Sequence, residues 1–224
     1  GEIMHQAKAY LEELGYNMRG YQEDAWFGYD MQSQVYLRER LGLGGANALL
    51  RADSLPAHHW YVYWYDKTLP RSQSRETFSM WISPAGKTLG FDHVINDSVG
   101  IPSLDSVQAR ALAEEFLRTH HVELAGYVLR SSSDTRQVNR VDHKFDWSRP
   151  DQSARATLWV RVQGNELGGF RMQYEPPGDF QRVFSQINTT TTFVGTASFA
   201  VVFLLLFFVV AIFLKKYHEG EVDV

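Results

Sequence analysis

Two segments of the chain, AKAYLEEL at residues 7–14 and ARALAEEF at residues 109–116, agree in character at every position. Each has small or apolar residues at helical spacing and a pair of glutamates on the opposite side, a pattern that predicts an amphipathic helix. We expect these helices to span residues 3–14 and 103–118, with Ser103 as the N-cap of the second. Self-similarity of this kind indicates an internal repeat.

Each predicted helix is followed by segments rich in aromatic and β-branched residues, which favour strands. Turn-forming residues, Pro84 to Gly86 in the first unit and Gly164-Asn165 in the second, interrupt the longer segments and predict hairpins. The expected strands are residues 58–66, a hairpin over residues 76–95, residues 138–147, and a hairpin over residues 154–174.

The two units differ by an insertion. The interval between the two helices, from Ala7 to Ala109, is longer than the interval between the two Gly-Phe pairs, from Gly90 to Gly169. The first unit therefore holds about 23 extra residues. They fall in residues 27–56, where Val35 to Leu43 predicts a short helix ended by Gly44-Gly45. A helix followed by a run of strands favours an α+β fold with an antiparallel sheet. We therefore expect two tandem helix-plus-antiparallel-sheet units, residues 1–100 and 101–175.

An uncharged apolar run, FVGTASFAVVFLLLFFVVAIFL, extends from Phe193 to Leu214 and is followed by Lys215 and Lys216. As a helix it would be about 33 Å long, enough to cross a hydrocarbon core of about 30 Å. The lysines predict a cytoplasmic tail at residues 215–224 under the positive-inside rule. Residues 1–192 would then be extracytoplasmic, on a cytoplasmic membrane. Residues 176–192, which open on Pro-Pro-Gly, are interpreted as a juxtamembrane linker that is helical in part.

Composition argues against several classes of function. The net charge of −4 gives no basic footprint for nucleic acid, and the absence of cysteine excludes disulfides and thiolate metal sites. No HExxH motif and no nucleophile elbow occurs among the 224 residues. We expect no catalytic residue, no metal and no cofactor in this chain.

The segment from His58 to Tyr65 is the best binding candidate in the sequence. Strand alternation places Trp60, Val62 and Trp64 on one face, which we interpret as core. Tyrosines on the other face either pack against the neighbouring unit or form a recognition surface for a peptide, protein or glycan. The candidate recognition face consists of His59, Tyr61, Tyr63 and Tyr65.

The order of these features resembles a known arrangement. The features that carry the resemblance are, in order, a helix of the form ARALAEEF, an aromatic strand, the segment Asp142-His143 with Phe145 and Trp147, a glycine hairpin, a proline break and one span ending in KKYHEGEV. The chain resembles the N-terminal region of bacterial CPBP-type (CAAX prenyl protease-like) intramembrane metalloproteases. Each repeat is similar to a PepSY-like unit. The resemblance implies an extracytoplasmic region ahead of further transmembrane helices.

The catalytic pattern of that family is a paired-glutamate EExxxR motif with histidines on later transmembrane helices, and this sequence departs from it. Glu12-Glu13 lacks the arginine, and Glu114-Glu115 has Arg118 one position too early. We interpret both pairs as solvated helix faces.

The sequence thus leads to a hypothesis of a non-catalytic, membrane-tethered interaction or regulatory region that binds or gates substrate for an intramembrane protease. The expected partners are the lipid bilayer, further transmembrane helices of a polytopic parent, and a peptide or protein ligand. Two alternatives stay open. The region either only supports folding and topology of such an enzyme, or it is a free-standing single-pass sensor or anchored binding protein.

Overall fold

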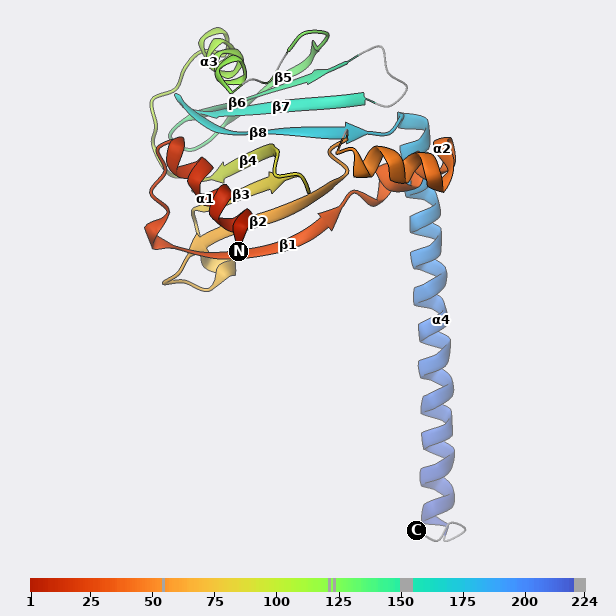
Figure 1. Ribbon diagram of the computed structural model, residues 1–224. Coiled ribbons are helices and arrows are strands. Elements are labelled where there is room, and N and C mark those ends of the chain that lie inside the picture. The colour runs from red at the N-terminus through yellow and green to blue at the C-terminus, as the bar shows by residue number, and fades with distance from the viewer. Residues whose placement is uncertain (54, 121, 123, 150–154, 220–224) are drawn as a thin grey trace. The chain divides into compact units, whose positions relative to one another are not determined.

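The computed structural model consists of two compact units. The first has an α+β fold built on one antiparallel sheet of eight strands (Figure 1). The second contains one long helix. The units are Gly1–Pro177 and Gly178–Val224, and the residues described are 1–53, 55–120, 122, 124–149 and 155–219.

The elements follow an order that occurs twice, a helix and then four strands, with one additional helix in the first occurrence. The first occurrence consists of α1 (Glu2–Glu13), β1 (Tyr21–Tyr29), α2 (Met31–Arg51), β2 (His58–Asp66), β3 (Thr77–Ile82) and β4 (Thr88–Val94), with short 3-10 turns at Met18–Gly20 and Arg71–Gln73. The second consists of α3 (Ser106–Thr119), β5 (Val128–Arg136), β6 (Val141–Ser148), β7 (Arg155–Gln163) and β8 (Glu166–Glu175).

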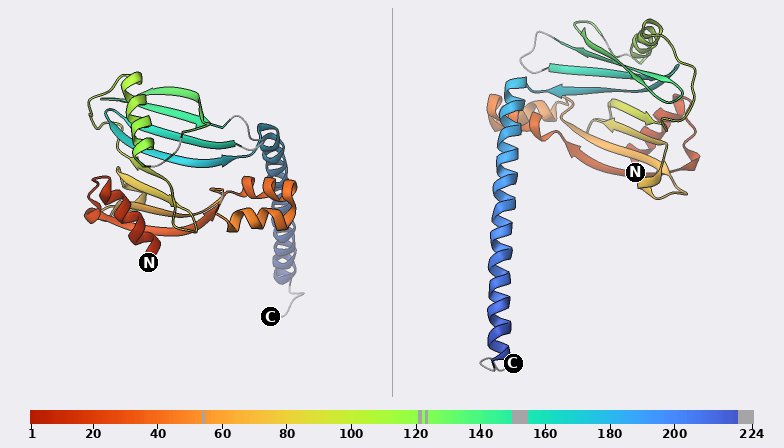
Figure 2. Two further views of the ribbon diagram at one scale, coloured as in Figure 1. Left: turned by 45° about the horizontal axis from the view of Figure 1, so that its top comes forward. Right: turned by 180° about the vertical axis from the view of Figure 1, so that it is seen from behind.

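The sheet has the strand order β1-β2-β3-β4-β8-β7-β6-β5, and every neighbouring pair is antiparallel. Helices α1 and α3 cover the same face of it, as the views in Figure 2 show. Their buried residues, among them Leu11 and Phe116, belong to one hydrophobic cluster with the inward side chains of the strands. We call the opposite side of the sheet the outer face.

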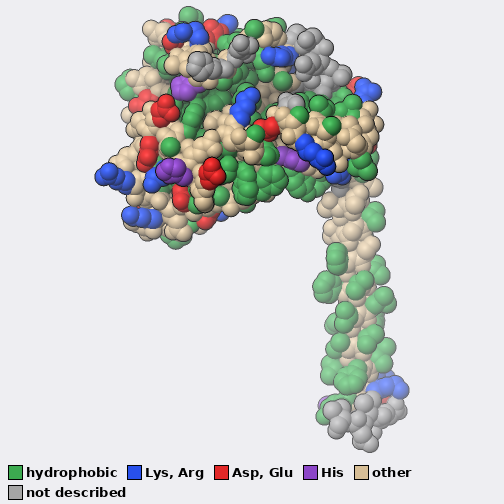
Figure 3. All heavy atoms as spheres, viewed as in Figure 1, with side chains coloured by type: hydrophobic (Ala, Val, Ile, Leu, Met, Phe, Trp, Pro, Cys, Tyr) green, Lys and Arg blue, Asp and Glu red, His purple; other side chains and the backbone are tan. Residues whose placement is uncertain are grey.

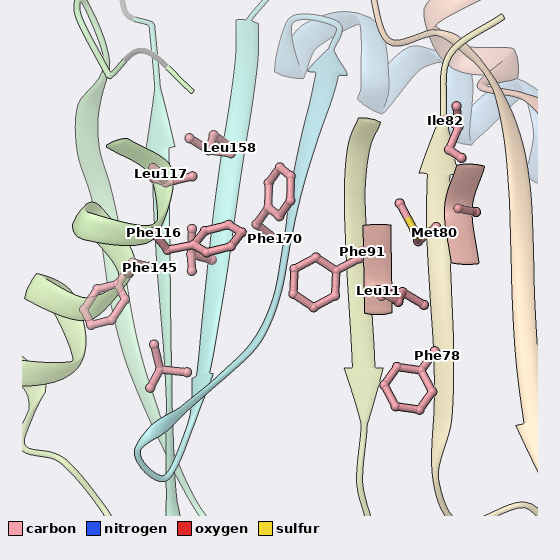
Figure 4. Close-up of a cluster of buried hydrophobic side chains, with 14 of the residues drawn as sticks. Leu11, Phe78, Met80, Ile82, Phe91, Phe116, Leu117, Phe145, Leu158 and Phe170 are labelled. Carbon is pink, nitrogen blue, oxygen red and sulfur yellow. The ribbon is translucent and has the colours of Figure 1, made fainter. Parts of the chain in front are cut away.

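The two halves of the sheet join where β4 pairs with β8, and this junction is formed by the repeated Gly-Phe pairs. Phe91 is the direct partner of Phe170, and their ring centroids lie 5.8 Å apart. Both rings point into the core (Figure 4). The glycines allow the close approach, because a Cβ on Gly90 would lie 2.3 Å from the Phe170 carbonyl oxygen and one on Gly169 would lie 2.5 Å from that of Phe91.

The predicted helices are present, with one correction. Ala7 of α1 and Ala109 of α3, which correspond in the repeat, are both fully buried. The N-cap of α3 is Asp105 rather than Ser103, because the Asp105 carboxylate accepts a hydrogen bond from the backbone N–H of Gln108. The Ser103 hydroxyl instead accepts a hydrogen bond from the backbone N–H of Val141, at the start of β6.

The helix expected at residues 35–43 is longer than predicted. It begins after Asp30, whose carboxylate caps it, and continues past Gly44-Gly45 to Arg51. The backbone interruption lies instead at Gly42, where φ is 66°. Because α2 lies between β1 and β2 in the chain, it accounts for the insertion expected within residues 1–100.

Two strands were not predicted, β1 and β5. In β5, VLRSSSDTR, nearly every side chain is exposed, so the apolar alternation that signals a strand is missing. Its position at the sheet edge explains this composition, because it has a single neighbour and little core to contact.

The hairpins predicted over residues 76–95 and 154–174 match β3-β4 and the described part of β7-β8.

The second unit has the single helix α4 (Gly178–His218), which extends over most of the expected linker as well as the apolar run. By length and composition it is the one described helix able to cross a membrane. Figure 3 shows apolar side chains along much of its surface, with lysine near its C-terminal end. The break expected at Pro176-Pro177-Gly178 separates β8 from this helix.

The Gly-Phe junction gives a direct test. In Gly90→Ala or Gly169→Ala, the new methyl group would collide with backbone atoms, so we expect a loss of about 2–4 kcal/mol in the free energy of unfolding. All six tryptophans lie in the first unit, so their fluorescence during urea unfolding of the full chain in detergent measures this change.

The matched control is Gly20→Ala. A Cβ at Gly20 meets no atom within 4 Å, and the expected change is within about 0.5 kcal/mol. Equal stabilities of the control and the junction variants would contradict the importance of the close approach.

Candidate functional site

A row of side chains crosses the outer face of the sheet at right angles to the strands. Strand register places Trp26 beside Tyr61, and Tyr61 beside Trp81. Gly90 is next, and beyond it Arg171 of β8. Because Gly90 has no side chain, the Arg171 guanidinium reaches across it and lies 4.3 Å from the centroid of the Trp81 ring. We call these four side chains, Trp26, Tyr61, Trp81 and Arg171, the outer-face row.

The tyrosines of β2 lie as the alternation predicted. Val62 and Trp64 are buried in the core, whereas Tyr61, Tyr63 and Tyr65 are partly exposed on the outer face. Neighbouring tyrosine rings stack, with centroids 6.2 Å and 6.0 Å apart. This arrangement leaves amphipathic rings in a continuous strip along the strand.

Ring and hydrogen-bond contacts hold Tyr61 in place. Its centroid lies 4.4 Å from that of Trp26 and 5.2 Å from that of Trp81, and its hydroxyl donates to the Ser79 hydroxyl at 3.0 Å. Burial raises the pKa of the Tyr61 hydroxyl. Trp26 is more accessible, with 42% of its surface exposed, although it lies beside Tyr61. The row is therefore ordered at its centre and accessible at its β1 edge.

A second cation, Arg71, lies at that accessible edge. Its guanidinium lies 4.5 Å from the centroid of Tyr63 and 5.3 Å from that of Trp26, and it forms a 3.5 Å ion pair with Asp24. Arg71 and Asp24 are both about half exposed. Aromatic rings and arginine are the side chains enriched at the centres of protein interfaces, whose rims are polar.

His59 completes the candidate face near the other end of β2. Burial lowers the pKa of its imidazole to about 4, and the nearby Arg171 guanidinium acts in the same direction. Asp30, the N-cap of α2, opposes this effect. The pKa of Arg171 is also lowered by burial. His59 is therefore neutral near pH 7 and forms part of the packing at the base of the face.

A partly buried ion pair crosses the same junction. Arg161 of β7 donates to the Asp92 carboxylate of β4 across Gly169 and also donates to the carbonyl of His93 at 3.1 Å. Burial raises the pKa of Asp92, although the Arg161 guanidinium opposes the shift. Arginines thus reach across both junction glycines, Arg171 over Gly90 and Arg161 over Gly169.

His93 and His143 are held by contacts within the fold. The rings of His93 and Phe78 stack with centroids 4.2 Å apart, and one ring nitrogen of His93 lies 2.7 Å from the Glu76 carboxylate. His143 contacts Asp134 at 2.7 Å and the Leu104 carbonyl at 2.9 Å, whereas its neighbour Asp142 pairs with Arg140. Among the described residues, no group of three His, Asp or Glu side chains is placed to hold a metal ion.

The glutamate pairs lie on solvent-exposed helix surfaces. Glu114 forms an ion pair with Arg110 at 2.7 Å, and Glu115 pairs with Arg118 one turn along α3. Exposed pairs at this spacing contribute a few tenths of a kcal/mol to helix stability. Their geometry fits the solvated faces expected from the sequence.

Sequence reasoning found the β2 face but missed Trp26, Arg71, Trp81 and Arg171. The alternation of Thr77, Ser79 and Trp81 within β3 was the signal available for Trp81. Arg171 carried no such signal, since its contact with Trp81 depends on the pairing of β4 with β8.

The chain was compared with protein-family models, curated proteins and solved structures, and none of them matches it. The functional assignment therefore depends on the geometry described above.

The pKa of His59 gives a pH prediction. The unfolded chain takes up this proton below about pH 6.5 and the folded chain only near pH 4, so the stability contributed by neutral His59 is complete above pH 6.5 and is lost as the pH falls toward 4. Because the ring is partly solvated, we expect a loss of about 1 kcal/mol, less than the full shift would give.

Urea unfolding at pH 7 and pH 4.5 measures this dependence. His59→Gln should reduce the difference between the two pH values, while His5→Gln, at an exposed position of α1, should leave it unchanged. An identical pH dependence in the wild type and His59→Gln would contradict the assignment.

Proposed function

We propose that this chain is a non-catalytic, membrane-tethered extracytoplasmic region that binds a protein or peptide partner through the outer-face row. In this proposal it acts as the interaction or regulatory part of a CPBP-type intramembrane protease. The observation that carries the proposal is the row of aromatic and guanidinium groups on the sheet face opposite α1 and α3, in which Trp81 is buried and the other three side chains are exposed in part. A cluster of this composition has the character of an interface centre rather than of a solvated surface.

We propose further that the compact body Gly1–Pro177 consists of two tandem PepSY-like repeats, residues 1–100 and 101–175. The twofold occurrence of one helix followed by four strands supports this division. So does the position of the repeated Gly-Phe pairs, which meet at the centre of the strand order, between β4 and β8. In this arrangement the units share one sheet and one core, so the recognition surface is held rigidly.

The tether in this proposal is the apolar part of α4, Phe193 to Leu214. Its length matches a bilayer core, and exposed apolar side chains cover it. Lys215 and Lys216 favour a cytoplasmic tail on a cytoplasmic membrane, with residues 1–192 on the opposite side. Further transmembrane helices of a parent protein would be the neighbours of this span.

Membrane insertion and orientation can be measured with one set of variants. The chain has no cysteine, so Asp97→Cys and Tyr217→Cys each provide a single thiol. We expect a membrane-impermeant maleimide to label Asp97→Cys in intact cells and Tyr217→Cys only after permeabilisation. The wild-type chain, which has no cysteine, should stay unlabelled. The reverse pattern would contradict the orientation.

Extraction of the membranes with alkaline carbonate tests the span itself. The wild-type chain should stay in the membrane pellet, and the double variant Leu205→Asp/Leu206→Asp should be released, because each charge at the centre of a span costs about 2.5–3.5 kcal/mol. Release of the wild-type chain would contradict insertion.

The recognition surface can be tested with peptide binders selected from a random dodecamer library against the full chain in nanodiscs. We expect Trp26→Ala and Arg71→Ala each to weaken binding of the selected peptides about tenfold or more, since central aromatic and arginine residues often contribute 2 kcal/mol or more. Both side chains are substantially exposed, so the melting temperature should change little.

Tyr29→Ala is the matched control. Tyr29 lies on the same strand, is 52% exposed and points away from the outer face. Equal losses in Trp26→Ala and Tyr29→Ala, or selected binders insensitive to both Trp26→Ala and Arg71→Ala, would contradict the proposed surface.

A further inference from the structure

A cleft of about 780 Å³ lies on the helix-covered side of the sheet, away from the outer-face row. Tyr10 and Glu13 of α1 line it, as do Thr119 and His120 at the end of α3. Strand β8 contributes Phe170 and Met172, and β4 contributes Thr88. A volume of this size is within the range of sites that hold small organic ligands.

Arg149 lines this cleft and has a hydrogen-bond donor without a partner in the described part of the chain. Its guanidinium lies 4.8 Å from the centroid of the Tyr127 ring, which fixes its position. Its Nε atom is buried and has no hydrogen-bond partner among the described residues. Because this atom is covered, a ligand in the cleft would meet the guanidinium through its terminal nitrogens.

The charges that line the cleft indicate which acceptor fits. Among the described residues that line it, Arg149 and Lys87 are cationic and Glu13 is anionic, and these three groups sum to one positive charge. A singly charged carboxylate matches this balance better than a doubly charged phosphate does. The planar guanidinium also presents its donors in the fork that a carboxylate accepts.

The rest of the lining indicates the body of the ligand. Met172 and Val122, both partly exposed, offer apolar surface for a hydrophobic side chain, and Phe170 is buried beneath them. Tyr10, Thr88 and Tyr127 bring hydroxyls to the same cleft, and these form no hydrogen bond with other described residues. Free hydroxyls beside apolar surface suit the amide groups of a peptide, which a simple hydrocarbon acid lacks.

We infer that this cleft binds the C-terminal end of a peptide, with the terminal carboxylate on Arg149 and the last apolar side chain on Met172 and Val122. This site is separate from the outer-face row and does not depend on it. The inference adds a small-ligand specificity to the chain, namely a free carboxylate on an apolar residue.

The test uses the full chain in nanodiscs and three probes in isothermal titration: N-acetyl-leucyl-phenylalanine, the same compound with a C-terminal amide, and 4-phenylbutanoate. We expect the peptide acid to bind about tenfold or more tightly than either of the others, since charge-assisted hydrogen bonds are among the strongest. Equal affinity of the acid and the amide, or no binding of the acid, would overturn the inference. A preference for 4-phenylbutanoate would overturn the peptide assignment.

Variants connect binding to the cleft. Arg149→Gln should remove the preference for the acid over the amide, and Arg149→Lys should restore only part of it because the fork is lost. Lys87→Gln, at an exposed position, should weaken acid binding severalfold without affecting folding. Arg136→Gln, an exposed arginine of β5, is the matched control and should bind as the wild type does. An unchanged acid preference in Arg149→Gln and Lys87→Gln would place the ligand elsewhere.

Trp26→Ala separates this inference from the proposed function. It should bind the acid normally even though it loses the selected dodecamer peptides. Loss of acid binding in Trp26→Ala, with the fold intact, would contradict the independence of the cleft.

Discussion

The pairing of β4 with β8 through Gly90-Phe91 and Gly169-Phe170 is the contact on which the rest of the first unit depends. It is short, with three paired residues on each strand, yet it makes one sheet and one core out of two sets of strands. Backbone atoms meet so closely there that a methyl group on either glycine would collide with a carbonyl oxygen. The two phenylalanines, packed with Phe116 of α3, fill the space below (Figure 4).

The same junction organises the chemistry of the outer face. Because neither glycine has a side chain, Arg171 reaches Trp81 and Arg161 reaches Asp92, each across one intervening strand. Both arginines therefore connect the two halves of the sheet, one by a cation–π contact and one by a partly buried ion pair. The outer-face row is rigid at its centre for this reason, and a rigid surface loses little conformational entropy when a partner binds.

The two candidate binding regions differ in ways that suit different ligands. The outer-face row is broad, aromatic and partly exposed, which suits a protein surface or an extended segment. The cleft between α1 and α3 is concave and is lined by Arg149 and Lys87 beside apolar side chains, which suits a small carboxylate. In the part of the chain that the structure describes, neither region holds a group of three His, Asp or Glu side chains placed to bind a metal ion.

The sequence by itself determined the elements whose signals are local. The helical spacing of Ala7 and Leu11, the alternation of Tyr61 with Val62, and the uninterrupted apolar run from Phe193 to Leu214 each indicate their structures without reference to the rest of the chain. Tertiary structure alone decided the features that depend on strand register between distant segments. The contact of Arg171 with Trp81, the edge strand β5 and the cleft around Arg149 follow from which strands pair, and no pattern within a single segment encodes that choice.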